Sequence, residues 1–348
     1  MNGRPLRFVA YVHGLYPHQR AGSETMLADM LEALALDGHE VHAVATLTGP
    51  ADGATSWEHG GVQCWRETEG AAAELVTMLE PDMIVSHHHV ALDALPLAKR
   101  LGVAGAAILH NDFKWSQAML NMRPELLVFN THWLKRKLGT RGAAAIVVHP
   151  PLHADRYALD APPPVDGAVT IINLDKIKGP NVFYALARQL PDTRFLAVRG
   201  GYGKQDERED YANVEFMDTT EDVRGDIWAR SRLVVAPSRY ESYGRGVVEA
   251  CAAGIPVIAT ATAGLRESLG PAGIFASRGN PAEWVRHARR LLSNPAEWDR
   301  ASGRALARAA ELDAMRRIEL EQWVRSASGA ARTARRLRDR RTAPTVTA

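Results

Sequence analysis

Cysteine is almost absent from this chain of 348 residues, which contains only Cys64 and Cys251. The two cysteines lie far apart and match neither a metal-binding nor a redox spacing. The sequence therefore indicates no disulfide framework of the kind that small secreted proteins use, and we expect a protein of the reducing cytoplasm.

Long apolar runs are also missing. No segment approaches the roughly 20 apolar residues of a membrane-spanning helix. The first apolar run, 8–12, is shorter than the apolar part of a secretory signal, which needs about 7–15 residues. We therefore expect no integral contact with a membrane. Apolar residues still make up 46% of the chain, which is enough for the cores of two α/β domains of ordinary size.

Acidic residues are scarce at the C-terminal end. Between Arg325 and Ala348 there are seven arginines and one acid, so removing these six net charges from the formal total of +2 leaves about −4. Residues 1–150 carry 12 Lys/Arg against 15 Asp/Glu. The body of the chain therefore offers no general attraction to nucleic acid or anionic lipid. Residues 327–348 are predicted to form a basic, flexible tail, and nucleic acid, if bound at all, would bind there.

Segments with strand and helix patterns alternate along the chain, which favours parallel sheets joined by crossover helices. The first half, residues 1–150, is predicted to be one such domain. A proline-rich segment, 151–167, contains the triplet 162–164 and is predicted to be a linker. A second series follows over 168–312. The predicted strands are 8–12, 41–46, 83–86, 106–109, 126–130, 145–148, 169–173, 195–198, 233–236 and 257–259, and the last predicted helices are 281–292, 296–312 and 315–324.

The most informative stretch is 239–259, which contains Glu241 and Glu249 separated by seven residues. It begins as a loop after an apolar strand and becomes a helix that Gly254 ends. A helix start presents free backbone N–H groups and partial positive charge, so it can receive a phosphate or sugar hydroxyls. Two carboxylates that flank such an anion site suggest a ligand with both phosphate and hydroxyls, as in a nucleotide sugar.

This stretch resembles the Glu-x(7)-Glu motif of retaining glycosyltransferases of the GT-B fold, in the large family 4-like group. The likeness extends to the following Ala-x-Gly-x-Pro-Val-Ile segment, 252–258. The resemblance implies an α/β protein with two Rossmann-like, doubly wound domains that face a central cleft. It also implies that residues 313–326 form a helix that crosses back to the first domain.

The resemblance assigns roles to the residues of the motif. It implies that Glu241 meets the donor sugar as a catalytic group, together with the backbone of Ser242, Tyr243 and Gly244. It places Glu249 on the ribose hydroxyls. By position in the family, the backbone of Met217 borders the nucleobase, whose identity the sequence does not reveal.

A second constellation concerns the donor diphosphate. Lys178 and Gly179 follow the predicted strand 169–173 and precede a helix that opens with Pro180, and they resemble the family's Lys-Gly at this place. Asn173 stands where the family usually carries an arginine, and an asparagine side chain cannot supply the positive charge that the arginine brings to the phosphate. Arg199 ends the next strand and is the preferred substitute, ahead of Lys204 and Arg245.

In the first half, His110 follows the predicted strand 106–109 and matches a family histidine that reaches the donor sugar. Gly22 lies in a strand-to-helix loop that resembles the family's glycine loop, where the absence of a Cβ lets backbone approach the diphosphate. The run His87–His89 ends another strand. Because alternation would point its members to opposite faces, we expect no three-histidine metal site.

The resemblance thus implies a hexosyltransferase that needs a nucleotide sugar as co-substrate and no other cofactor, and we expect it to be independent of metal. No Asp-x-Asp triplet occurs, the pair with which metal-dependent sugar transferases of the other common fold hold their cation. The acceptor is not identified. Three alternatives stay open: a GT-B sugar phosphorylase, a catalytically weak nucleotide-sugar-binding protein, and a glycosyltransferase that acts on modified nucleic acid.

Overall fold

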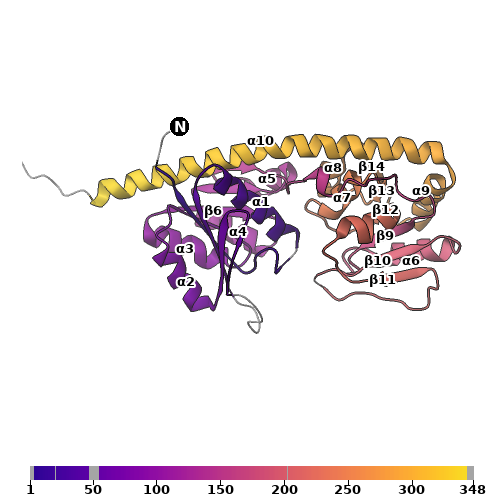
Figure 1. Ribbon diagram of the computed structural model, residues 1–348, viewed down its shortest axis with the longest axis horizontal. Helices are drawn as coiled ribbons and strands as arrows, with labels where there is room; N and C mark the ends of the chain where they lie inside the picture. Colours follow the sequence, from indigo (N-terminus) through magenta and orange to yellow (C-terminus); the bar gives the residue numbers. More distant parts are fainter. Residues whose placement is uncertain (1–3, 20, 47–54, 202, 343–348) are drawn as a thin grey trace, which may run out of the picture. The chain divides into compact units, whose positions relative to one another are not determined.

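The computed structural model describes residues 4–19, 21–46, 55–201 and 203–342. The chain divides into two compact units, which are considered separately (Figure 1). Unit 1 comprises Met1–Pro150 and Arg316–Ala348, and unit 2 comprises Pro151–Met315.

Unit 1 is built on an eight-stranded sheet in the order β3-β4-β2-β1-β5-β6-β7-β8. All neighbouring strands pair in parallel except β3 and β4, which form an antiparallel hairpin at the edge. The strands are β1 (Arg7–Val12), β2 (Glu40–Thr46), β3 (Ser56–His59), β4 (Val62–Glu67), β5 (Met83–His87), β6 (Ala104–Leu109), β7 (Leu126–Phe129) and β8 (Ala144–Val147).

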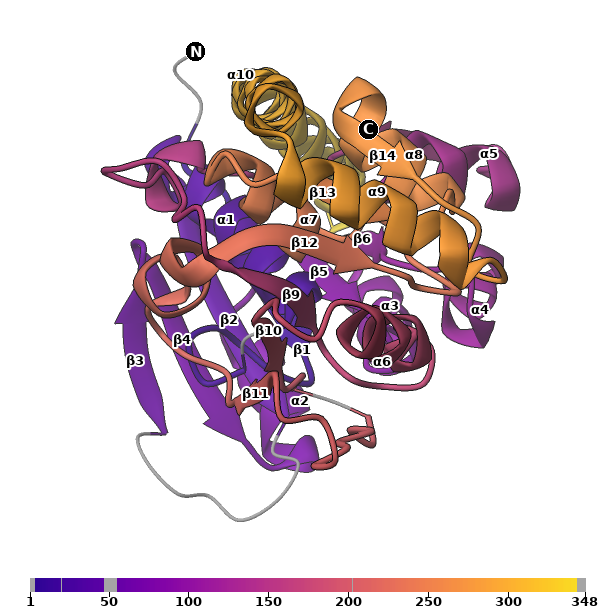
Figure 2. The same ribbon diagram turned by 90° about the vertical axis from the view of Figure 1, so that its right-hand side faces the viewer.

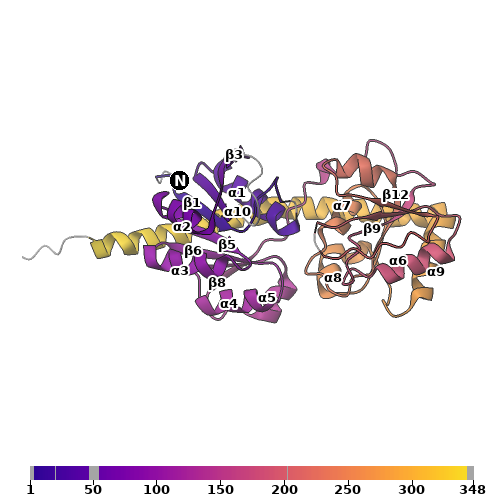
Figure 3. The same ribbon diagram turned by 90° about the horizontal axis from the view of Figure 1, so that it is seen from below.

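Helices cover both faces of this sheet, as a parallel sheet requires. Alternate residues of β1 pack in opposite directions: Phe8 joins the cluster under α1 and the C-terminal helix α10 (Pro295–Thr342), whereas Val9 joins the cluster under α2 and α3. Figure 3 shows α3, α4 and α5 gathered on one side of the unit. The helices are α1 (Gly22–Leu36), α2 (Glu69–Met78), α3 (Ala91–Leu101), α4 (Lys114–Met122) and α5 (His132–Leu138).

Unit 2 is built on a six-stranded parallel sheet in the order β11-β10-β9-β12-β13-β14. Its strands are β9 (Ala168–Ile172), β10 (Phe195–Val198), β11 (Val214–Met217), β12 (Ser231–Ala236), β13 (Val257–Ala259) and β14 (Gly273–Phe275). Its helices are α6 (Pro180–Gln189), α7 (Arg245–Ala252), α8 (Ala263–Leu269) and α9 (Pro281–Ser293), with short helical turns η1 (Ala154–Arg156), η2 (Val223–Ile227), η3 (Trp228–Arg230) and η4 (Gly270–Ala272). Residues of α6 and α9 share one core and residues of α7 and α8 share another, on opposite faces of the sheet (Figure 2).

Each sheet contains a switch point, where the order of the strands reverses direction along the chain. In unit 1 it lies between β1 and β5, and in unit 2 it lies between β9 and β12. Both units are therefore doubly wound, Rossmann-like sheets, as the sequence predicts. In such sheets ligands bind outside the carboxyl ends of the strands at the switch point, so the loops that follow these four strands are the first to consider.

The C-terminal part of the chain differs from the expectation. One helix, α10, runs from Pro295 to Thr342 in place of two separate helices and a flexible tail over 327–348. No proline and only two glycines occur in this range after Pro295, and its many alanine and arginine residues favour the helix. The prediction of a flexible tail is therefore wrong up to Thr342, and residues 343–348 lie outside the described part of the chain.

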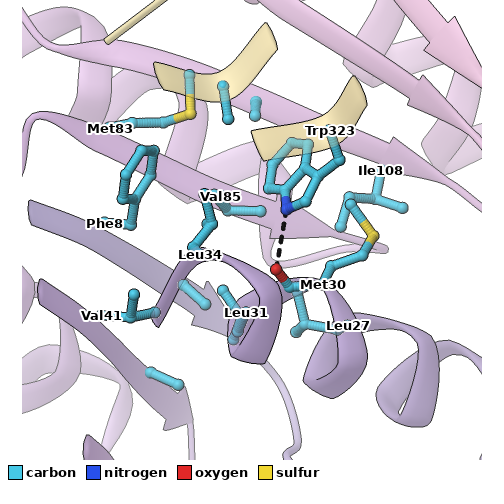
Figure 4. Packing of buried hydrophobic residues seen from close by; sticks show 14 of the residues in the cluster. Phe8, Leu27, Met30, Leu31, Leu34, Val41, Met83, Val85, Ile108 and Trp323 are labelled. Atoms are coloured by element: carbon cyan, nitrogen blue, oxygen red, sulfur yellow. Dashed lines mark hydrogen bonds between the residues drawn. The ribbon is translucent and has the colours of Figure 1, made fainter. Parts of the chain in front are cut away.

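Packing on unit 1 explains why the basic segment is ordered. Trp323, Ala327 and Ala331 lie four residues apart on one face of α10 and are buried in the core of unit 1. Figure 4 shows the Trp323 ring among the side chains of α1 and the strands, with its Nε1–H donated to the carbonyl oxygen of Met30 at 2.9 Å. Arg335 also donates through Nε to Asp82 at 2.6 Å.

Among the described residues, no helix has both the length and the apolar character that crossing a bilayer requires.

Candidate functional site in unit 2

Two loops meet at the switch point of unit 2: the loop 173–179 after β9 and the loop 237–244 after β12. The backbone N–H of Arg239 donates to the carbonyl of Ile177 at 2.7 Å. The Arg278 guanidinium links both loops, because it donates to the carbonyl of Pro237 at 2.9 Å and to that of Lys176 at 3.2 Å. The sheet therefore supplies one rigid platform from two distant parts of the sequence.

Two glycines let the loop 237–244 lie close to its neighbours. Gly179 precedes α6 with φ +85°, and a Cβ there would meet the carbonyl oxygen of Pro237 at 2.3 Å. On the other side, a Cβ on Gly264 of α8 would meet the carbonyl oxygen of Glu241 at 2.3 Å. Any larger residue at either position would displace the loop that carries Glu241.

Lys178 and Glu241 form an ion pair at this place. The Lys178 Nζ lies 2.5 Å from Glu241 Oε1, and each side chain is only 17% exposed. The hydroxyl of Ser238 donates to the same carboxylate oxygen at 3.2 Å. The structure thus brings together the residue predicted for the diphosphate and the residue predicted for the sugar, with a hydroxyl that fixes the carboxylate.

Glu249 is held in a second ion pair, one turn inside α7. Arg245 Nε lies 2.7 Å from Glu249 Oε1, and the same guanidinium donates to the hydroxyl of Tyr157 at 3.2 Å. Burial and the nearby Glu249 carboxylate raise the pKa of Tyr157. Because Gly244, the residue before α7, has φ +89°, the chain turns sharply between the two carboxylates.

The residues that follow Glu241 differ in burial. Tyr243 is buried in the core beneath α7, whereas Ser242 is half-buried. A Cβ on Gly244 would meet the Leu265 side chain at 2.7 Å, so this glycine is required by packing as well as by its backbone angle. The side chain of Tyr243 is therefore part of the core of unit 2.

Asn173, predicted for the diphosphate, has a structural role. It is buried and has φ +69°, a left-handed conformation in which asparagine is among the best-tolerated residues. Its Oδ1 accepts from the N–H of Asp175 at 2.8 Å and from Gln205 Nε2 at 3.1 Å. These contacts shape the loop that leads to Lys178.

Arg199, the predicted substitute for the missing arginine, is engaged by two carboxylates. Its guanidinium lies 2.7 Å from Glu207 and 3.1 Å from Asp218. Its backbone N–H donates to the carbonyl of Met217 at 2.8 Å, so that carbonyl is already used within the sheet. The charge of Arg199 is compensated on the surface, and Lys178 is the better supported cation.

Unit 1 contains the remaining predicted residues. Gly22 is the first residue of α1. His110 is buried after β6, and its Nε2 lies 2.9 Å from Nδ1 of His87. Burial, reinforced by the neighbouring imidazoles, holds the pKa of both histidines well below the ordinary value. Burial likewise lowers the pKa of His88 to about 4, so the cluster is uncharged near neutral pH.

The alternation of side chains along a strand, from which we expected no three-histidine site, ends at His87. Strand β5 ends at His87, and His88 has φ +54°. The left-handed residue interrupts the alternation of side chains, so the rings of His87 and His88 lie with centroids 4.6 Å apart. The ring of His88 also stacks on His110 at 5.0 Å.

Sequence reasoning missed several residues that build the unit 2 site: Ser238, Arg278, Tyr157 and Gln205. Arg278, Tyr157 and Gln205 act through contacts between segments that are separate in the sequence, which no local pattern predicts, whereas Ser238 contacts Glu241 three residues further along the same loop. Gly179 and Gly264 carry a weak signal, because a glycine just before or just inside a helix often marks a close approach.

Comparisons with known proteins agree with this geometry. The model of the family "Glycosyl transferases group 1" matches residues 170–294. Two curated D-inositol 3-phosphate glycosyltransferases, from Mycobacterium sp. strains KMS and MCS, are each 29% identical over 172 residues, which cover 42% of this chain and 39% of theirs. The chain spans about two fifths of the length of these relatives.

Solved structures are similar over nearly the whole chain. Sucrose-phosphate synthase from Thermosynechococcus elongatus has a TM-score of 0.70 at 16% identity and covers 94% of this chain and 98% of its own. Anabaena HepE in complex with UDP and glucose has a TM-score of 0.72 at 17% identity, with 91% and 99% covered. These likenesses define the class by fold: the chain has the GT-B fold of glycosyltransferases.

Proposed function

We propose that this chain is a retaining glycosyltransferase that moves a sugar from a nucleoside-diphosphate sugar to an acceptor. The observation that carries the proposal is the pairing of Lys178 with Glu241 at the switch point of unit 2, with Glu249 one turn inside α7. The starts of α6 and α7 and an ammonium group suit a diphosphate, and the two carboxylates suit hydroxyl groups. The match of the family model to residues 170–294 and the UDP bound by HepE support the same ligand class.

Each residue receives a role in this proposal. Lys178 neutralises the diphosphate and Glu249 accepts hydrogen bonds from the ribose hydroxyls. Glu241 and the backbone over 242–244 hold the sugar. In unit 1, His110 contacts the donor sugar and Gly22 allows the backbone to approach the diphosphate, as the family resemblance implies.

The chemistry follows from where charge develops. As the bond between the sugar and the diphosphate breaks, negative charge grows on the leaving phosphate oxygen. Lys178 and the N–H groups of the helix starts stabilise that charge, which is the kind of interaction that accelerates a reaction most. The leaving oxygen then takes the proton of the acceptor hydroxyl, and the new glycosidic bond forms with retained configuration and without a dedicated general base.

The test begins with the donor. Purified protein is screened with UDP-, GDP- and ADP-sugars by thermal shift, and the donors that stabilise it are followed by calorimetry. Acceptors are then screened with the best donor, starting with D-inositol 3-phosphate, for which the curated relatives are named. Product configuration is read from the anomeric signals in NMR spectra. Absence of binding by every nucleotide sugar would overturn the proposal, an inverted product would overturn retention, and turnover that requires orthophosphate would identify a phosphorylase.

A further inference from the structure

The switch point of unit 1 carries a group of side chains that the proposed transfer does not use. His13 directly follows β1, His87 ends the adjacent strand β5, and Glu24 lies in the first turn of α1. One ligand atom from each of these three residues lies within 4.8 Å of the others. The three are thus gathered at the sheet edge where doubly wound proteins bind ligands.

Two ring nitrogens of this group lack a hydrogen-bond partner among the described residues, Nδ1 of the half-buried His13 and Nε2 of the fully buried His87. His87 is fully buried, its Nδ1 is paired with Nε2 of His110 at 2.9 Å, and its Nε2 has no hydrogen-bond partner among the described residues. A buried polar atom left without a partner destabilises a protein by about 1–3 kcal/mol. Native structures seldom retain such an atom unless it has a further role or partner. The unpartnered Nε2 of His87 therefore indicates that this atom binds a ligand.

We infer that His13, Glu24 and His87 bind a divalent transition metal of the zinc type. Two imidazoles and one carboxylate form a set that zinc accepts, with one coordination position left for another group. His13 Nε2 and Glu24 Oε1 are 3.1 Å apart and hydrogen-bonded. On a metal the two atoms would separate only slightly, to the roughly 3.3 Å that metal–ligand distances of 2.0–2.1 Å give in a tetrahedron. A bound cation would coordinate the Nε2 of His87 and compensate the charge of Glu24, which is 2% exposed.

Partners behind two of the three ligands, Glu24 and His87, already orient them. The hydroxyl of Ser23 donates to Glu24 Oε2 at 2.8 Å, which leaves Oε1 directed to His13. With Nε2 on the metal, His87 keeps its proton on Nδ1 and donates it to His110. Metal-binding histidines characteristically donate their second ring N–H in this way. The metal would therefore also fix the tautomer of His110, with Nε2 as acceptor and Nδ1 protonated.

A second combination, His87, His88 and His110, also lies within 4.8 Å, and the structure favours it less. His87 Nδ1 and His110 Nε2 are 2.9 Å apart, which is the separation of a hydrogen bond and shorter than that of two ligands on one metal. This set also lacks an anion to compensate a divalent charge, whereas the first set contains Glu24.

The experiment measures metal binding directly, so its outcome does not depend on the transferase proposal. Full-length protein is stripped with chelator, exchanged into chelator-free buffer and titrated with zinc against a chromophoric competitor, and bound metal is counted after dialysis. The expected result is one zinc per chain. His13→Ala, at a half-buried position that should tolerate the change, should weaken binding by more than the about 10–100-fold that follows loss of an outer partner. Ser23→Ala should fall within that outer-partner range.

Matched variants separate the alternatives. Glu24→Gln keeps the shape of the side chain and should weaken zinc binding as strongly as His13→Ala. His89→Ala removes an exposed histidine of the same run and should leave the affinity unchanged. Thermal unfolding of each variant checks that it is folded. No zinc in the wild type, or equal losses in His89→Ala and His13→Ala, would overturn the site. Loss of zinc in His88→Ala with retention in His13→Ala would overturn the assigned ligands.

Discussion

At the scale of single residues, the carboxylate of Glu249 offers a sharp test of the donor site. Glu249→Gln should weaken binding of the nucleoside diphosphate by about 1.5–3 kcal/mol, the value of a hydrogen bond to a charged group. Calorimetry measures the change, and Glu209→Gln, at an exposed position of the same unit, is the control. A 2′,3′-dideoxynucleoside diphosphate should bind the wild type and the variant equally. If the variant still discriminates against it, Glu249 does not contact the ribose.

Glu241 should behave differently from Glu249, because it is proposed to meet the sugar. Glu241→Gln should reduce kcat about 100-fold or more, as expected when a group that acts on the transition state is lost. The nucleoside diphosphate alone should bind at least as tightly as before, since Lys178 is released from the ion pair of 2.5 Å. Single-turnover rates and calorimetry on the same preparation separate the two effects. Intact turnover, or a loss confined to affinity, would refute the role.

At the scale of elements, the docking of α10 on unit 1 includes a contact with a half-buried histidine, His39. His39 accepts from the N–H of Leu6 through Nδ1 at 3.4 Å, and its Nε2 lies 2.9 Å from the hydroxyl of Ser328 in α10. Burial lowers the pKa of His39, Asp37 opposes this shift, and Arg332 adds to it.

Because the pKa of His39 is lower in the folded chain, the unfolded chain binds more protons below the ordinary value near 6.5. The free energy of unfolding should therefore fall as the pH is lowered from 7.5 toward 5.5. Urea unfolding of His39→Gln at several pH values should show a shallower dependence than the wild type, since one titrating group is gone. A slope that His39→Gln leaves unchanged would contradict this assignment.

The C-terminal segment of α10 should be a structural part of unit 1, contrary to its expected flexibility. Ala331→Asp places a charge in the core and should destabilise the unit by several kcal/mol. Leu337→Asp lies on the exposed face of the same helix, at 52% exposure, and should change stability by less than about 0.5 kcal/mol. Thermal unfolding measures both. Equal melting temperatures for wild type and Ala331→Asp would show that this segment does not dock.

The arginines of the same segment are relevant to the hypothesis that the acceptor is a nucleic acid. Arg335 binds Asp82, and Arg338 lies 3.7 Å from the same carboxylate. These two arginines, which the sequence presents as part of a solvated tether, share one compensating carboxylate within unit 1, which weakens the alternative of a transferase tethered to nucleic acid.

At the scale of the whole molecule, the sequence predicts those features that depend on local patterns, such as the bounds of strands and the residues at their ends. The apolar runs of β10 and β13 have the predicted bounds, and the residues that follow β9, β6 and β12 lie at strand ends as expected. The β3–β4 hairpin was not predicted, although Gly60 and Gly61, both with positive φ, form its turn. This pair is an ordinary hairpin signal.

Contacts between distant segments could not be predicted. Lys178 and Glu241 are 63 residues apart, and only the adjacency of β9 and β12 brings them together. Asn173 illustrates the limit of assigning a role by position: its left-handed backbone and its bond to Gln205 make it a structural residue. The contacts of the His88 ring with His87 and His110 depend on the left-handed backbone angle of His88, which no pattern of side chains reveals.

A last prediction concerns metal in the transfer itself. The proposed chemistry neutralises the diphosphate with Lys178 and two helix starts, and the sequence contains no Asp-x-Asp pair to hold a cation on the substrate. Transfer should therefore continue within a few-fold in excess EDTA, while the zinc inferred in unit 1 is removed. Initial rates with and without chelator, together with a metal count on the same sample, measure both. Complete loss of activity that magnesium or manganese restores would show that a cation bridges the diphosphate, and Lys178→Gln would then reduce the rate only slightly. Retained activity in EDTA combined with a large loss in Lys178→Gln is the result that the ion pair at the switch point predicts.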